Sequence, residues 1–324
     1  MIEVKKKNYL FFIFKILIFI ISCYLIYSNI SNEKKFFYVF NQIDITSFLV
    51  VLLITIILNH IQIFVQIKAF LRKKMNDISF IKYSKIFFNS QMISFILPHS
   101  GIIYKTYELK KFNLSYKDFI AVNLFLTWFY LFFFIAFYSF EILIFGNNIL
   151  GSYSLFIFAI GILASLTLFI LPFLYNKFIK IDFKNKIFSK VYDTLNYILL
   201  LPVTFMNKKF FKFLAIYGVL GHILSFLLIY LLFNSIDQNI KFSFIILFFV
   251  TNSFLDQVPI TPKNLAISEL VFGMVSSNIG LGFEFGVAIK LLIRLFFFIN
   301  LISLTILYNT LDQINRNEKR DYRN

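Results

Sequence analysis

Long apolar runs dominate this sequence, and each is about as long as a bilayer is thick. A helix needs about 20 predominantly apolar residues to cross the hydrocarbon core of a membrane. Hydrophobic residues make up 59% of the chain and charged residues 15%, against roughly 25% charged in an ordinary globular domain. We therefore predict an all-α polytopic transmembrane helical bundle that forms one integral membrane domain over residues 1–324. The predicted spans are residues 10–30, 46–67, 119–145, 152–175, 213–233 and 286–307.

Two further apolar regions, residues 84–107 and 242–277, are interrupted by proline. Pro98 interrupts the first region, and Pro259 and Pro262 interrupt the second. Proline removes a backbone donor from a helix, and irregular backbone at membrane depth is tolerated only where protein or a water-filled cavity surrounds it. We predict that each region is a re-entrant helical hairpin. The alternative is an ordinary kinked transmembrane helix, because proline is frequent in such helices.

The distribution of Lys and Arg favours the hairpins, because basic residues in short loops remain on the cytoplasmic side. If both broken regions return to the side they entered, the basic stretches 68–85, 105–117 and 177–212 are all cytoplasmic. An arrangement with eight crossings keeps the same termini inside but moves several basic residues outside. We therefore predict that one hairpin enters from each side and that both termini are cytoplasmic. The basic residues left in external loops are Lys34, Lys35 and Lys241.

The remaining composition argues against several classes of protein. The net charge of +16 does not indicate nucleic-acid binding, because the basic residues lie in short loops and not on one folded face. The single Cys23 excludes an internal disulfide, and no Cys/His cluster has the spacing of a metal site. No Walker-type phosphate loop and no convincing Ser/His/Asp order occurs. We therefore predict no cofactor, no metal and no enzymatic activity.

Four charged residues lie in or beside the second broken region and the last span: Asp256, Glu269, Lys290 and Arg294. A charged side chain costs about 2.5 to 3.5 kcal/mol at the centre of an inserted helix, so we expect these four to pair or to face a cavity. Lys290 and Arg294 project from one helical face and repel each other unless an anion lies between them. That anion is Asp256, Glu269 or a substrate phosphate. An internal salt-bridge network that locks the hairpin to the last helix is the alternative, and Lys290 could instead snorkel to the surface.

The first broken region has its own polar residues, which are Asn89, Gln91, His99, Ser100 and Lys105. His99 follows Pro98 and lies beside Gly101, where the backbone can approach a ligand closely. A single histidine in a membrane is also commonly a hydrogen-bonded packing residue, and we interpret His222 in the same way. Glu141 lies near the end of a span, where we expect it to snorkel.

Two stretches of sequence resemble a known family. Residues 259–269, PITPKNLAISE, followed by Arg294, resemble the pattern P-x-T-P-G-x-x-G-x-x-E … R of the lysylphosphatidylglycerol synthase transmembrane-region family, whose members are also called flippase-like. Residues 97–101, LPHSG, with Lys105, resemble the L-P-x-x-G … R pattern of that family's other hairpin. The resemblance covers nearly the whole chain and implies a helical bundle with re-entrant elements.

Some positions depart from the family patterns. Lys263 and Ala266 stand where the family usually has glycine, Ile102 replaces an acidic residue, and Lys105 replaces arginine. In bifunctional members the membrane region is similar to a flippase for a modified phospholipid and is joined to a soluble aminoacyl-transferase domain. We expect this chain, which ends at Asn324, to lack that domain and to transfer no lysyl group.

The resemblance and the charge pattern together predict a translocator of an anionic phospholipid or a polyprenyl-phosphate-linked sugar across a bacterial inner membrane. The alternative is a non-catalytic membrane subunit that docks a glycosyltransferase or another envelope-biosynthesis enzyme through the basic stretch 177–212. A membrane-embedded glycosyltransferase would need an acidic base at the outer face, for which Glu284 and Asp237 are the candidates. The predicted substrate-binding residues are Arg294, Lys105, Glu269, Asp256, Lys290 and His99. The predicted structural residues of the hairpins are Pro98, Gly101, Pro259 and Pro262.

Overall fold

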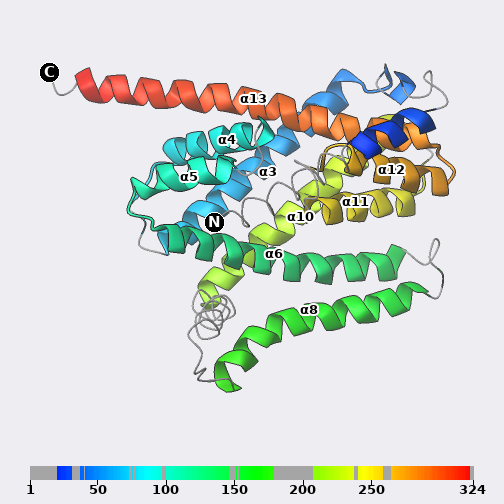
Figure 1. Cartoon of the computed structure of the whole chain (residues 1–324), viewed down its shortest axis with the longest axis horizontal. Coiled ribbons are helices and arrows are strands. Elements are labelled where there is room, and N and C mark those ends of the chain that lie inside the picture. The colour runs from blue at the N-terminus through cyan, green and yellow to red at the C-terminus, as the bar shows by residue number, and fades with distance from the viewer. Residues whose placement is uncertain are drawn as a thin grey trace, which may run out of the picture. The chain divides into compact units, whose positions relative to one another are not determined.

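The structure is a computed structural model of the whole chain (Figure 1). It describes residues 20–30, 37–39, 41–72, 75, 77–96, 100–145, 151, 153–178, 207–236, 240–257 and 264–321. Within these ranges the fold is all-α and contains no strand, so the predicted fold class is confirmed. The labelled helices are α3 (Ile45–Leu71), α4 (Phe80–Ile96), α5 (Ser100–Lys110), α6 (Tyr116–Phe145), α8 (Tyr153–Phe178), α10 (Lys208–Ile236), α11 (Phe242–Gln257), α12 (Ile267–Asn278) and α13 (Phe283–Asp321).

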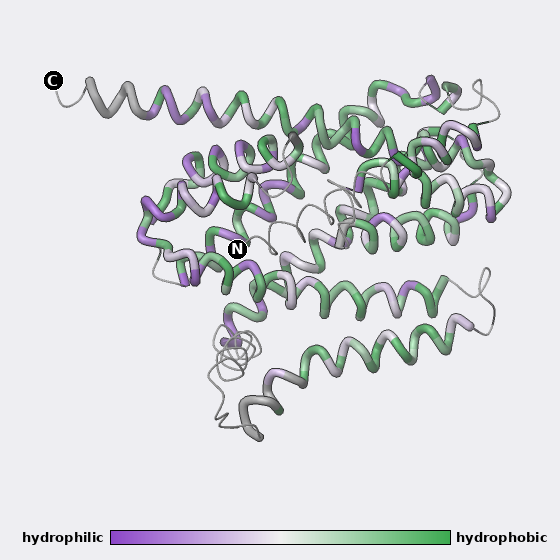
Figure 2. Tube along the Cα trace, in the orientation of Figure 1, coloured by the Kyte–Doolittle hydropathy of each residue, from purple (hydrophilic) through white to green (hydrophobic). Residues whose placement is uncertain are grey.

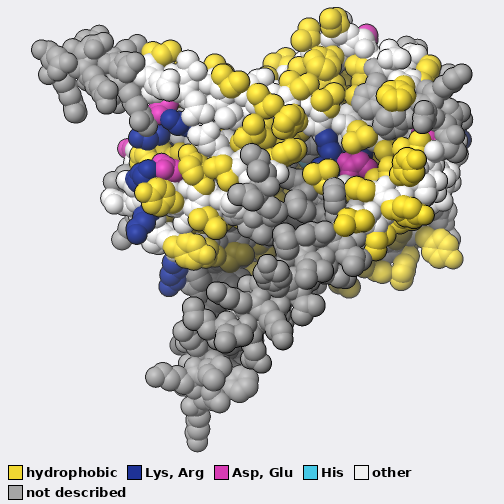
Figure 3. Space-filling model, turned by 45° about the horizontal axis from the view of Figure 1, so that its top comes forward, with side chains coloured by type: hydrophobic (Ala, Val, Ile, Leu, Met, Phe, Trp, Pro, Cys, Tyr) yellow, Lys and Arg dark blue, Asp and Glu magenta, His cyan; other side chains and the backbone are white. Residues whose placement is uncertain are grey.

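Five of the described helices are long and apolar enough to cross a membrane, namely α3, α6, α8, α10 and α13. They correspond to five of the six predicted spans. The sixth prediction, residues 10–30, is described only from residue 20 onward, where a short apolar helix covers Ile20–Asn29. The long helices expose large apolar side chains, such as Leu155, Phe156 and Leu163 on α8. Apolar side chains also predominate among the coloured ones on the face drawn in Figure 3. Such surfaces require lipid, so the chain is a multi-pass integral membrane protein.

The last helix is longer than its predicted span. α13 contains 39 residues, which at 1.5 Å per residue is about 58 Å and exceeds the thickness of a bilayer core. Its span-like part is Phe283–Asn315. Figure 2 shows the change along the helix, from mostly hydrophobic residues to hydrophilic ones toward the C-terminus.

Each proline-broken region contains two helices that are too short to cross a bilayer alone. α4 and α5 have 17 and 11 residues, and α11 and α12 have 16 and 12. The first helix of each region ends at Ile96 or Gln257, and Pro98, His99, Pro259 and Pro262 lie outside the described residues. The short helices are compatible with hairpins, and the return of each hairpin to the side it entered stays a prediction.

Close packing at Gly101 joins α5 to α4. The Ser100 hydroxyl donates to the carbonyl oxygen of Ile93 at 3.2 Å. A Cβ atom at Gly101 would overlap the carbonyl oxygen of Ser90 and the hydroxyl of Ser94. Only glycine permits this approach of the two backbones, so α5 folds back against α4 at this point.

Two glycines give the pair α12 and α13 a similarly close contact. A Cβ atom at Gly286 would overlap the Phe272 backbone, and one at Gly273 would overlap the Phe283 ring. The turn between the helices contains Gly280 and Gly282, whose φ angles of 83° and 92° are readily adopted by glycine. The helices therefore form a tight antiparallel pair, which places the start of α12 beside the first third of α13.

The chain divides into two compact units, each assembled from separate stretches of sequence. Unit 1 comprises 1–59, 84–102 and 224–324, and unit 2 comprises 60–83 and 103–223. Each has a core of buried aromatic rings. In unit 1 the rings include Phe233, Phe248, Phe272 and Phe296, and in unit 2 they include Phe70, Phe125 and Phe129. The expectation of one membrane domain over residues 1–324 stays a prediction.

Candidate functional site

The central feature of unit 1 is a buried ion pair between α12 and α13. Arg294 on α13 forms a salt bridge through Nε with Oε1 of Glu269, which lies in the first turn of α12. The Glu269 side chain is 3% exposed and that of Arg294 is 19% exposed. The N-terminal end of a helix favours negative charge, so α12 also stabilises the Glu269 carboxylate. The structure thus brings together two of the predicted substrate-binding residues.

Ser268 completes the contacts of the guanidinium. Arg294 Nη2 donates to Ser268 Oγ at 2.7 Å and to Glu269 Oε2 at 3.4 Å. The Ser268 hydroxyl in turn donates to the carbonyl oxygen of Asn264 at 3.0 Å. Ser268 was not among the predicted site residues. Its position beside Glu269 in the motif was the available signal.

An unusual backbone leads into α12 and positions these groups. Asn264 has a φ of 53° and Ala266 a φ of 67°, values that most L-residues avoid. The Asn264 amide donates to the carbonyl oxygen of Leu255 near the end of α11. Ala266 is one of the positions where the family pattern usually has glycine, and its positive φ gives that preference a physical reason.

Lys290 lies one turn before Arg294 on α13 and is held inside unit 1. Its ammonium donates to Asn252 Oδ1 on α11 at 2.5 Å and lies 5.2 Å from the centre of the Phe272 ring. The residue is only 5% exposed, so the alternative in which it snorkels to the surface is wrong for this structure. Asn252 was not among the predicted residues. Asp256 lies one helical turn further along α11, and its side chain is outside the described part of the structure.

Polar contacts also connect α4 to the later part of α13 within unit 1. Lys85 and Asp312 form a salt bridge of 2.8 Å. One turn away, the side-chain amides of Asn89 and Asn309 exchange hydrogen bonds of 3.0 and 3.3 Å. Of these residues, Asn89 was noted as a polar residue of the first broken region and Lys85 only as part of a basic loop. The first broken region and the second are therefore both tied to α13 by polar side chains.

Lys105 belongs to a separate polar cluster in unit 2. It is 7% exposed, and its ammonium donates to Gln66 Oε1 at 2.5 Å. The Tyr83 hydroxyl donates to the same oxygen at 2.8 Å, and the ammonium lies 5.2 Å from the Tyr83 ring and 5.8 Å from the Phe70 ring. The predicted residue Lys105 is thus a buried cation. Gln66 and Tyr83, which hold it, were not predicted.

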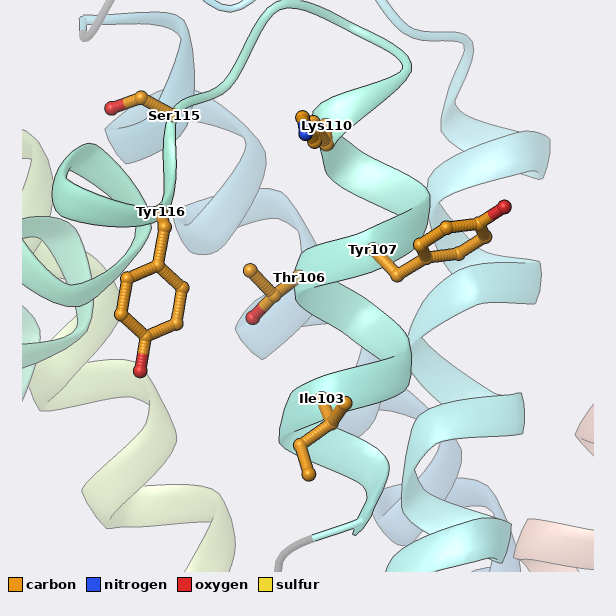
Figure 4. Close-up of a pocket in the computed structure, with 6 residues that line it drawn as sticks. All are labelled: Ile103, Thr106, Tyr107, Lys110, Ser115 and Tyr116. Carbon is orange, nitrogen blue, oxygen red and sulfur yellow. The ribbon is translucent and has the colours of Figure 1, made fainter.

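A pocket of about 480 Å³ opens between α5 and the start of α6 in unit 2. Figure 4 shows Thr106 directed toward Tyr116 across the opening. Ser115 caps α6, because its hydroxyl accepts from the Asp118 backbone at 3.1 Å. None of the predicted substrate-binding residues lines this pocket. The lining residues are Ile103, Thr106, Tyr107, Lys110, Ser115 and Tyr116.

Comparison with known proteins gives one match. The family model described as "Lysylphosphatidylglycerol synthase TM region" matches residues 12–304, a range that contains Glu269, Arg294 and every described helix from α3 to α12. No curated protein matches this chain, and no solved structure does.

Proposed function

Because the chain belongs to the lysylphosphatidylglycerol synthase TM region family, we propose that it is a flippase-like translocator of an anionic phospholipid or a lipid-linked sugar. The proposed location is the bacterial inner membrane with both termini in the cytoplasm. No chemical transformation of the lipid is part of the proposal. The family and the apolar helices support the membrane part of this statement, and the charged site supports the substrate class.

The observation that carries the proposal is the buried pair Glu269–Arg294 with Lys290 on the same helical face. Arginine presents a planar fork of donors that matches a phosphate oxygen pair. In the observed state those donors are occupied by Glu269 and Ser268. A headgroup phosphate can replace the Glu269 carboxylate at the guanidinium, so Glu269 acts as an internal substitute for the substrate. Lys290, one turn away, adds positive charge for the same anion.

The remaining predicted residues take supporting roles in this proposal. Asp256, whose side chain lies outside the described part of the structure, is proposed as a second acidic group for Arg294 when no lipid is bound. Lys105, with Gln66 and Tyr83, is a separate cation of unit 2 that attracts a headgroup, and His99 is a polar contact in the break of the first hairpin. Pro98, Pro259 and Pro262, which lie outside the described residues, are proposed to interrupt helices so that backbone groups can face the path of the headgroup.

Headgroup translocation in reconstituted vesicles tests the proposal. Purified protein is placed in phosphatidylcholine vesicles that contain a fluorescent phosphatidylglycerol or a labelled polyprenyl phosphate, and exchange between leaflets is followed by quenching from outside. Wild-type protein is expected to move at least one of these lipids, and Arg294→Ala is expected to abolish the movement. A matched control is Asp312→Asn, because Asp312 lies on α13 like Arg294 but forms its salt bridge with Lys85 of α4. This variant is expected to retain lipid movement. If the wild type is no faster than Arg294→Ala with all lipids, the proposal is wrong.

A docking role is the alternative, and exposed cations at the start of α10 favour it. Lys208, Lys209 and Lys212 are exposed there and belong to the basic stretch 177–212. A partner such as a glycosyltransferase would contact this stretch from the cytoplasm. Co-purification separates the two functions. Docking is supported if a stoichiometric partner co-purifies with the wild type and is lost when residues 177–212 are deleted, and if the wild type moves no lipid.

A further inference from the structure

A second ionisable pair lies within unit 2, between α6 and α10. Glu141 Oε1 and His222 Nε2 are 2.7 Å apart, and their side chains are 18% and 14% exposed. The imidazole stacks on the Phe137 ring at 4.8 Å. The expectation that Glu141 snorkels is therefore wrong, because its carboxylate contacts a histidine of a neighbouring span.

The position of His222 is unusual for an ionisable group, whereas Glu141 lies four residues before the end of α6 at Phe145. His222 is the central residue of the 29-residue helix α10, about 21 Å from either end at 1.5 Å per residue. Between Asp118 and Glu141 α6 has no acidic, basic or histidine residue, and after Lys212 α10 has none except His222. The two isolated ionisable residues of these spans therefore meet each other.

The surroundings contribute few other groups that can titrate. Tyr138 of α6 faces the imidazole, with ring centres 5.3 Å apart. On α10 the nearest titratable residues are Tyr217 and Tyr230, which lie more than one turn away along the helix. The third element is α8, which packs on α6 through a 3.0 Å hydrogen bond from Trp128 Nε1 to the Leu168 carbonyl. Between Tyr153 and Asn176, α8 has no acidic, basic or histidine residue.

The chemistry of the pair distinguishes it from a simple contact between helices. Two amides or hydroxyls would join the helices equally well without any ionisable group. A carboxylate and an imidazole that share one proton form an electrically neutral unit, whereas the loss or gain of a proton leaves a net charge inside apolar surroundings. Histidine and acidic residues form proton relays in membrane transporters for this reason.

We propose that Glu141 and His222 form a proton-binding site and that proton exchange there is coupled to movement of the lipid headgroup. One proton enters from water on one side of the membrane, is shared between the carboxylate and the imidazole, and leaves to water on the other side. No covalent bond other than that to the proton changes, and no electron is transferred. Proton binding is independent of the proposed function, whereas the coupling rests on it.

Direct protonation is measured first, without any lipid substrate. Infrared difference spectra of the purified protein are recorded on acidification through the range of about pH 8 to pH 5, in which histidine changes charge. We expect a carboxyl band that is present in the wild type, absent in Glu141→Gln and shifted in His222→Gln. Both substitutions retain a polar group that can hydrogen-bond across the helices, which preserves folding. Absence of any such band in the wild type would overturn the proposal.

Coupling is measured in the vesicle assay with an imposed pH difference and a clamped membrane potential. A gradient of one pH unit carried by one proton is expected to sustain up to about tenfold asymmetry of the labelled headgroup at steady state. Glu141→Gln is expected to lose this asymmetry, whereas the control Ser139→Ala, on the same helix, is expected to keep it. Lipid movement in the wild type that ignores the gradient overturns the coupling. If the wild type moves no lipid but shows the infrared band, the proposed function fails and the proton site stands.

Discussion

At the scale of single residues, the backbone of Ala266 makes the most direct prediction. Its φ of 67° is a left-handed value that costs an L-residue about 1–2 kcal/mol and costs glycine nothing comparable. Ala266→Gly is therefore expected to increase the free energy of unfolding by about 1 kcal/mol. The thermal unfolding midpoint in detergent is expected to rise accordingly. Ala288→Gly, in the second turn of α13, is the control and is expected to lower the midpoint by a similar amount. A lower midpoint for Ala266→Gly would contradict the backbone description.

The pair Glu269–Arg294 makes the second prediction at this scale. Removal of one partner leaves the other charge buried, which typically costs about 3–5 kcal/mol. Glu269→Gln and Arg294→Gln are each expected to lower stability strongly. The double variant is expected to lose less unfolding free energy than the two single variants lose in sum, by about 0.5–3 kcal/mol. Unfolding of the four proteins in a denaturing detergent checks this, and strict additivity would show that the two side chains do not interact.

The same residues show what sequence can and cannot predict about the site. Glu269 and Arg294 were selected because charges are rare in apolar spans and must be compensated. Ser268, Asn252 and Gln66 were missed, because neutral polar residues carry no comparable penalty and occur throughout membrane helices. Their roles follow only from distances that the sequence does not contain.

At the scale of elements, Gly101 controls how α5 packs on α4. A methyl group there would overlap the Ser90 carbonyl oxygen, and forced overpacking typically costs about 1–3 kcal/mol. Gly101→Ala is expected to destabilise the protein by that amount. Gly221→Ala on α10 is the matched control, since no atom lies within 4 Å of its added Cβ. The control is expected to gain about 0.5–1 kcal/mol from helix propensity, and thermal unfolding of both variants makes the comparison.

The boundaries of the elements were predicted less well than their existence. Hydropathy located five of the described long helices because each must contain a continuous apolar stretch. It placed the end of the last span at residue 307, whereas α13 continues to Asp321. The extra residues are polar helix, which apolar counting cannot detect, and their contacts include the pairs Asn309–Asn89 and Asp312–Lys85. The described helices α4 and α11 end shortly before the prolines, at Ile96 and Gln257, but these prolines lie outside the described residues, so their role as helix breakers stays a prediction.

At the scale of the whole molecule, the central question is the side of the membrane on which α5 ends. The six-span arrangement with two hairpins was preferred because it keeps basic loops in the cytoplasm. The short lengths of α4, α5, α11 and α12 alone fit either arrangement, whereas the folding back of α5 on α4 at Gly101 favours a hairpin for the first region. The family match covers most of the chain but assigns no side to any loop.

Cysteine labelling decides between the two arrangements. In a Cys23→Ser background, cysteine is placed at Lys110 and, in a second variant, at Tyr153, both of which are exposed. Six spans with hairpins predict that position 110 is labelled only from the cytoplasm and position 153 only from outside. Eight crossings predict the reverse for both, because the additional crossing at residues 84–107 inverts every loop up to the second broken region. Labelling of position 110 from outside alone would refute the hairpin at residues 84–107. The two broken regions would then not enter the membrane from opposite sides, and the proposed headgroup path depends on that arrangement.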